Sequence, residues 1–110
     1  CPVPGGGQPD AAAIIAAIEA CTNTRIETIV GKPSAHMATA ILGLIDLPPQ
    51  SCLMTGDRLE TDVQMGIAAG MASALTLTGA TSLDDAAESA IHPNFIVRNI
   101  GELLPDWGHA

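Results

Sequence analysis

Apolar residues along this chain fall into helix-like and strand-like stretches. Residues 10–21 are rich in Ala and Ile, and apolar residues within 34–45 recur at the spacing of one helix face. Asp10 and Ser34 can cap the first turns of these two helices. Residues 51–55 form a short continuous apolar run, which is typical of a strand buried on both faces of a parallel sheet.

The rest of the pattern adds further elements of both kinds, separated by Gly, Pro and polar residues. We expect a strand over residues 26–30, a helix over 61–69 that Gly70 closes, a strand over 72–78, a short helix from Ser82, a strand over 95–98 and a helical turn over 99–104. From residue 31 onward helices and strands alternate, which favours parallel strands joined by right-handed crossovers. The predicted fold class is α/β, with a parallel sheet and flanking helices.

Size and charge narrow the classes of function. The chain has 110 residues, of which 47% are apolar, so one modest core is the upper limit. Twelve acids against four bases give a net charge of −8. An acidic chain with 2% aromatic residues has neither the basic footprint nor the stacking platform that nucleic-acid binding needs. We therefore expect no nucleic-acid partner.

The lack of a targeting signal in these residues, together with the cysteine spacing, leads us to expect a cytoplasmic protein. No apolar run approaches the ~20 residues of a membrane span, and no basic region precedes an apolar stretch as in a signal peptide. Cys1, Cys21 and Cys52 are an odd number without a C-x-x-C pair, which argues against a disulfide scaffold or a zinc site. The chain begins with Cys1 rather than Met, so we expect a processed or truncated product.

Two carboxylates flank the loop that follows the predicted strand over 51–55. Asp57 comes after the strand and Gly56, and Asp62 lies in the first turn of the next predicted helix. Ligands of open parallel sheets bind beyond the carboxyl ends of the strands, and Mg²⁺ takes one or two protein carboxylates there. The spacing allows a divalent-metal site, but Asp57 is equally suited to a turn and Asp62 to the positive end of a helix dipole.

Lys32 is the basic candidate at the start of a helix. It lies in a Gly-Lys-Pro turn, where its ammonium could bind a phosphate group as a point charge. A solvated surface lysine is the competing interpretation. The spacing of the histidines, cysteines and serines contains no nucleophile–base arrangement.

Four motifs stand out along the chain: GKPS at 31–34, CLMTGDRLETD at 52–62, GIAAG at 66–70 and LTLTG at 75–79. Together they resemble one family, the haloacid-dehalogenase-like (HAD) phosphatases with a large inserted α/β cap. The branch resembled includes 4-nitrophenylphosphatase-like, phosphoglycolate/pyridoxal-phosphate and nucleotide phosphatases. The resemblance implies that residues 1–30 are the C-terminal end of the cap. Residues 31–110 would be the C-terminal half of the Rossmann-like core.

The resemblance also implies roles for individual residues. Lys32 matches the lysine that stabilises the phosphoryl group and the charge of the nucleophile. Asp57 matches the carboxylate that ligates Mg²⁺, and Asp62 matches the second acid of that motif, which supports the metal site. The implied activity is Mg²⁺-dependent hydrolysis of a small phosphorylated metabolite, in which electrostatic positioning supplies much of the rate.

One motif of the family is absent from the sequence. The first motif, D-x-D, supplies the attacking and the acid–base aspartates, and no D-x-D occurs among the 110 residues. We therefore expect a C-terminal fragment that lacks its nucleophile and is inactive alone. The missing motif lies on the strand beside residues 51–55 in the family, so that strand would become an unpaired edge. We expect an N-terminal segment or a second copy of the chain, as a homo-oligomer, to complete the sheet.

Two other interpretations remain open at this point. The chain could be a non-catalytic, degenerate HAD domain or an assembly subunit that binds Mg²⁺ or phosphate. It could also be an unrelated binding module of the receiver-domain kind, in which acids at strand ends hold Mg²⁺. The latter requires an acidic pair after an early first strand, and residues 1–10 contain only Asp10.

Overall fold

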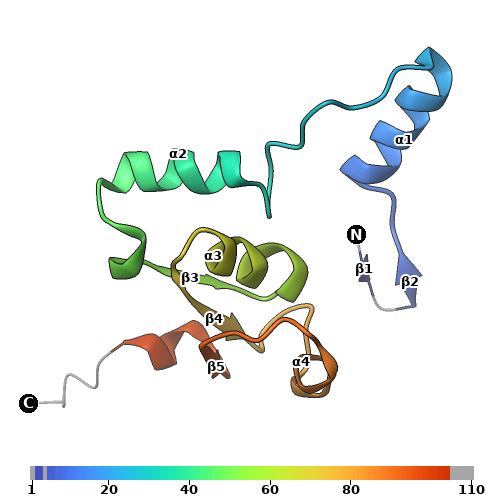
Figure 1. The fold of residues 1–110 in the computed structure, drawn as a ribbon. Coiled ribbons are helices and arrows are strands. Elements are labelled where there is room, and N and C mark those ends of the chain that lie inside the picture. The colour runs from blue at the N-terminus through green and yellow to red at the C-terminus, as the bar shows by residue number, and fades with distance from the viewer. Residues whose placement is uncertain (1, 4, 105–110) are drawn as a thin grey trace, which may run out of the picture.

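The structure, a computed structural model, describes residues 2–3 and 5–104 (Figure 1). The strands are β1 (Pro2–Val3), β2 (Gly6–Gly7), β3 (Leu53–Gly56), β4 (Ala72–Thr76) and β5 (Phe95–Val97). The helices are α1 (Ala11–Thr22), α2 (Ala35–Ile45), α3 (Gln64–Ala68) and α4 (Leu83–Glu88). Two short 3₁₀ helices, η1 (Pro49–Ser51) and η3 (Ile100–Leu103), and a π-helical turn, η2 (Leu59–Val63), complete the order.

A three-stranded parallel sheet organises residues 53–97 in the order β3-β4-β5. The register places Thr55 of β3 beside Ala74 of β4, and Ala74 beside Phe95 of β5. This arrangement confirms the α/β class and the parallel sheet with flanking helices that the sequence predicts. Parallel strands all end at the same edge, so the loops after β3 and β4 lie next to each other.

Polar side chains start the three longer α-helices where the sequence predicts them. The Asp10 carboxylate accepts the backbone N–H of Ala12 at the start of α1, and the Ser34 hydroxyl accepts that of His36 at the start of α2. Ser82 and Asp85 form a reciprocal capping box at the start of α4. Each of these caps supplies a partner for a backbone N–H that the first turn leaves unpaired.

The core consists of two apolar clusters on the helix-covered face of the sheet. Ala38, Met65 and Met71 join α2 to α3, with Met54 of β3 against them. The second cluster joins the π-turn, β4 and α4 through Leu59, Val63, Leu75 and Ala86. Gly66 of α3 lies so close to Met54 of β3 that a Cβ would crowd the Met54 side chain. The two clusters therefore hold α3 and η2 directly against the sheet.

On the opposite face, the outer strands β3 and β5 carry exposed side chains, whereas Ala74 and Thr76 of the central strand β4 are buried. Leu53 is 42% exposed and Phe95 54% exposed, and the register puts both on the face away from α3. The expectation that residues 51–55 are buried on both faces is therefore wrong. Within the described ranges β3 pairs with β4 alone.

Residues 24–30 form neither helix nor strand, so the strand expected over 26–30 is wrong. Ile29 and Val30 are about 60% exposed, and α1 buries no residue. Figure 1 shows α1 standing apart from the sheet, linked by this extended segment. The Cα radius of gyration is 16.7 Å, against about 13 Å for a compact chain of this length. The alternating pattern finds no partner strand in the described part of the chain.

No helix in the described ranges has the length and apolar content that a membrane crossing requires. The division of the chain at residue 30 stays a prediction.

Candidate functional site

The loop after β3 folds back on the strand through a π-helical turn. The N–H groups of Asp62 and Val63 both bond to the carbonyl of Arg58, at 3.1 and 3.2 Å. The helix therefore begins at Leu59, two residues earlier than the sequence pattern indicates. The wide turn places the Asp62 side chain directly over Gly56, where any Cβ would overlap the carboxyl group. Glycine is required at position 56 for this return of the chain.

Asp62 and Lys32 form an ion pair at the carboxyl end of β3. The Lys32 ammonium lies 2.6 Å from Asp62 Oδ1, and the Arg58 N–H donates to Asp62 Oδ2 at 3.3 Å. The Asp62 side chain is 4% exposed, whereas that of Lys32 is 48% exposed. A buried carboxylate needs partners for both oxygens, and Asp62 has them. Half of the Lys32 side chain remains accessible to a second anion.

Asp57 is bound by the loop that follows β4. Its Oδ2 atom accepts the backbone N–H of Ala80 at 2.7 Å, and its carbonyl accepts that of Thr81 at 3.2 Å. A Cβ at Gly79 would overlap the Asp57 carboxyl group. These contacts leave Asp57 Oδ1 as the carboxylate oxygen without a hydrogen bond in the described part of the chain.

The three residues that the sequence singles out thus lie at one end of β3, with different partners. Lys32 comes from the turn before α2 and meets Asp62 in the π-turn. Among residues 2–3 and 5–104, no hydrogen bond or ion pair joins Asp57 to either of them. The Lys32–Pro33 peptide bond is cis.

The donor set fits a magnesium ion held mainly by Asp57. No three His, Cys, Asp or Glu side chains gather as a metal cluster within the described ranges. Mg²⁺ keeps several waters and binds through one or two carboxylates plus substrate phosphate, so it does not require such a cluster. The free Oδ1 of Asp57 meets that need, while both Asp62 oxygens already have partners.

The loop at 79–81 is the part of the site for which the sequence assigned no role. Gly79 ends one of the family-like motifs, but its contact with Asp57 depends on how two parallel strands are aligned. Gly56 pairs with Leu75, so the residues after β3 face those after β4. The place of Gly79 in its motif, directly after the predicted strand over 72–78, is the signal that the sequence offers.

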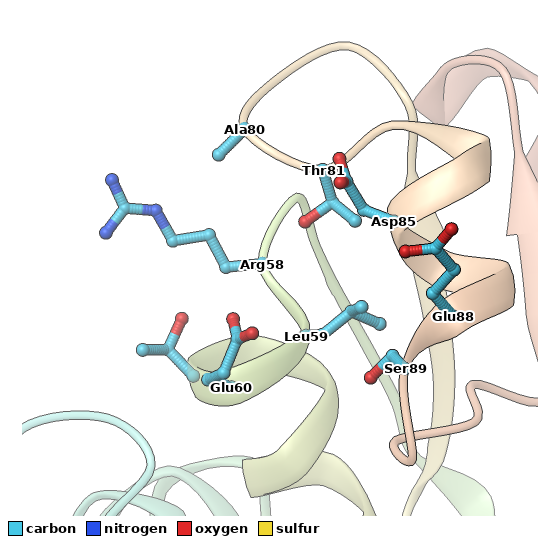
Figure 2. A pocket seen from close by; sticks show the side chains of 9 residues that line it. Arg58, Leu59, Glu60, Ala80, Thr81, Asp85, Glu88 and Ser89 are labelled. Carbon is cyan, nitrogen blue, oxygen red and sulfur yellow. The ribbon is translucent and has the colours of Figure 1, made fainter. Parts of the chain in front are cut away.

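A pocket of about 680 Å³ opens beside this loop. Figure 2 shows Ala80 and Thr81 above it, Arg58 and Glu60 on one side, and Asp85, Glu88 and Ser89 of α4 and its end on the other. Hydrogen bonds from the Ser82 side chain and backbone N–H hold the pKa of Asp85 below its ordinary value. Acids and hydroxyl groups dominate the lining.

Comparisons with known proteins identify relatives of this chain. A family profile described as HAD-hydrolase-like matches residues 29–103. Chronophin from Rattus norvegicus is 36% identical over 110 residues, which cover 94% of this chain and 35% of that protein. Glycerol-3-phosphate phosphatase from Gallus gallus is 33% identical, covering 94% of this chain and 36% of the relative. The chain therefore spans about a third of the length of these curated relatives.

Solved structures show the same similarity in three dimensions. The 4-nitrophenylphosphatase of Thermotoga maritima is 42% identical with a TM-score of 0.83, over 94% of this chain and 40% of that one. NagD from Escherichia coli K-12 is 33% identical with a TM-score of 0.78, over 89% of this chain and 39% of that one. Both likenesses extend over most of the described residues.

Proposed function

Because the chain belongs to the HAD-like hydrolase family, we propose that it is the C-terminal part of a Mg²⁺-dependent phosphomonoester hydrolase. Phosphatases among its relatives and among similar solved structures support the reaction class. In the proposed reaction an aspartate oxygen attacks phosphorus, the ester P–O bond breaks, and the alcohol leaves with a proton. Water then hydrolyses the aspartyl-phosphate to phosphate and the free carboxylate.

The observation that carries this proposal is the ammonium of Lys32 held by buried Asp62 at the carboxyl end of β3. An ammonium fixed in this way can meet the negative charge of a phosphoryl group without having to be ordered during the reaction. Its 48% exposure leaves room for that second contact. Asp62 thus acts on the phosphate through Lys32, and supports the metal site as the second acid of the motif.

Asp57 is the proposed metal ligand. Bound Mg²⁺ would neutralise charge on the transferred phosphoryl group and on the attacking oxygen. Asp57 Oδ1 faces no competing hydrogen bond in the described ranges, which suits coordination by one carboxylate oxygen. The remaining ligands would come from water, the phosphate and the nucleophile.

The nucleophile in this proposal lies outside these 110 residues. No D-x-D occurs in the sequence, and the relatives extend well beyond the matched region. The open edge of β3 offers a strand of the parent protein, or of a second copy, a place to pair. The isolated chain is then a phosphate-binding half site without turnover.

A second candidate function is a non-catalytic HAD-like domain or assembly subunit that binds Mg²⁺ or phosphate. It requires no nucleophile, because Lys32 and Asp57 could bind ligands without one. The two candidates differ in one measurable property, turnover by the complete gene product.

The test is hydrolysis of p-nitrophenyl phosphate by the full-length gene product and by the 110-residue chain alone, each with Mg²⁺ and with EDTA. We expect Mg²⁺-dependent turnover by the full-length product and none by the lone chain. A full-length product without turnover on this or other phosphomonoesters would favour the second candidate. Turnover by the lone chain that disappears in Asp57→Asn would contradict the proposed half site.

The expected partners follow from the same proposal. The substrate is a small phosphorylated metabolite, and nucleic acid and membrane are not partners. We also propose a cytoplasmic location, which the unpaired thiols of Cys21 and Cys52 support because reducing compartments keep cysteines unpaired.

A further inference from the structure

Residues 79–81 bind Asp57 from one side only and contact one of its two carboxylate oxygens. The Ala80 N–H donates a hydrogen bond to one carboxylate oxygen of Asp57, Oδ2, at 2.7 Å. The Thr81 N–H donates to the Asp57 backbone carbonyl at 3.2 Å. One loop therefore fixes both the backbone and the side chain of Asp57. The carboxylate is consequently oriented by the neighbouring strand end, and the opposite oxygen is left available.

Gly79 makes this close approach possible. A Cβ built at Gly79 would overlap the Oδ2, Cγ and Cβ atoms of Asp57. Backbone dihedrals are not the reason for glycine here, because Gly79 does not have a positive φ angle. The requirement is space for the carboxyl group alone.

We propose that residues 79–81 are positioning residues for the metal ligand: Gly79 admits the Asp57 carboxylate, and the Ala80 N–H turns its Oδ1 atom toward the cation. This inference rests on the proposed metal role of Asp57. A metal ligand whose second oxygen is hydrogen-bonded is held in one orientation, and loss of such an outer contact commonly weakens metal binding.

The experiment measures metal binding rather than turnover. Mg²⁺ affinity of the full-length gene product is determined by isothermal titration calorimetry, with Mn²⁺ electron paramagnetic resonance as a second probe. We expect Gly79→Ala to raise the dissociation constant about tenfold or more. The matched control is Gly43→Ala in α2, where an added Cβ meets nothing within 4 Å, and it should bind as the wild type does.

A double variant separates positioning from general damage to the fold. If Gly79 acts through Asp57, then Gly79→Ala adds no further loss of affinity to Asp57→Asn. Additive losses would overturn the proposal, as would wild-type affinity in Gly79→Ala. Absence of Mg²⁺ binding by the wild type would instead overturn the metal role of Asp57 itself, so the two failures are distinguishable.

A third measurement needs no substitution at position 79. The Ala80 amide resonance of ¹⁵N-labelled protein should shift saturably on addition of Mg²⁺, because the hydrogen-bonded carboxylate is the ligand. In Asp57→Asn the same resonance should start at a different position and stay unmoved by Mg²⁺. An Ala80 amide that ignores Mg²⁺ in the wild type, while other amides respond, would overturn the proposal even if Gly79→Ala cannot be purified.

Discussion

At the scale of single residues, Lys32 and Asp62 differ sharply in environment. Asp62 is buried with both oxygens paired, and the Lys32 side chain that pairs with it is about half exposed. An exposed ion pair contributes little to stability, but removal of one partner from a buried carboxylate leaves a charge without compensation. The pair is thus better explained as an anchor for the ammonium than as a source of stability.

Removal of the Lys32 ammonium is expected to impair catalysis and, because buried Asp62 then loses its charged partner, to lower stability as well. In the full-length gene product, Lys32→Ala should lower kcat/KM about tenfold or more, because one preorganised charge is lost. Steady-state hydrolysis of p-nitrophenyl phosphate is the measurement. Arg25→Ala removes a cation from the exposed Arg25–Glu19 pair and serves as the control, with kcat/KM unchanged. Equal kinetics in both variants would remove Lys32 from the mechanism.

Gly56 leaves the space in which the Asp62 carboxyl group packs against β3. Gly56→Ala should lower the free energy of unfolding by about 1–3 kcal/mol, because the new methyl group overlaps the Asp62 carboxyl. Gly43→Ala should instead stabilise α2 by about 0.5–1 kcal/mol. Urea unfolding of the wild type and both variants measures these changes in the free energy of unfolding. A neutral Gly56→Ala would mean that Asp62 can move away without loss.

At the scale of secondary-structure elements, the sequence was informative wherever local chemistry decides the outcome. Asp10, Ser34 and Ser82 begin helices as predicted, because a capping side chain acts within its own turn. The strand expected over 26–30 fails because alternation describes a face but provides no partner strand. Tertiary contacts also extend the helix expected from residue 61 back to Leu59, since the π-turn forms where Asp62 packs on Gly56.

The same distinction applies to the candidate site. The sequence alone supplies Lys32, Asp57 and Asp62 as candidates because their motifs are local strings. The contact between Asp57 and the Ala80 N–H could not be found from the sequence, because 23 residues separate them and only the register of β3 and β4 brings them together.

The capping box of α4 should be sensitive to acid. The pKa of Asp85 is lowered in the folded chain by the Ser82 side-chain and backbone hydrogen bonds. A lowered folded-state pKa contributes stability above the unfolded pKa, and that contribution is lost as pH falls through the folded value. The difference in unfolding free energy between wild type and Asp85→Asn should therefore be present at neutral pH and vanish in acid. A difference that is constant with pH would contradict this.

At the scale of the whole molecule, the two faces of the sheet differ in how far the described residues cover them. Helices cover one side of the sheet, while Leu53 and Phe95 are exposed on the other and the outer edge of β3 is unpaired. Open strand edges beside exposed apolar side chains favour pairing with another chain.

The isolated 110-residue chain is therefore expected to self-associate. Light scattering coupled to size-exclusion chromatography should give a mass that increases with concentration. Leu53→Lys should reduce this association, because a charged edge strand resists pairing. Leu83→Lys, at a 57% exposed position on α4, is the control and should leave the association unchanged. A monomer at all concentrations would show that the open face needs no cover.

The contact between Gly56 and Asp62 has a consequence for how this site can change over generations. A larger residue at position 56 is incompatible with the acid at 62 in its present place, so the two positions cannot vary independently. Descendants that abandon the glycine must first shorten or relocate the acid, and with it the anchor of the ammonium. We thus expect substitutions at these positions to occur in a fixed order: Gly56 is replaced only in lineages in which the Lys32–Asp62 ion pair has already been lost.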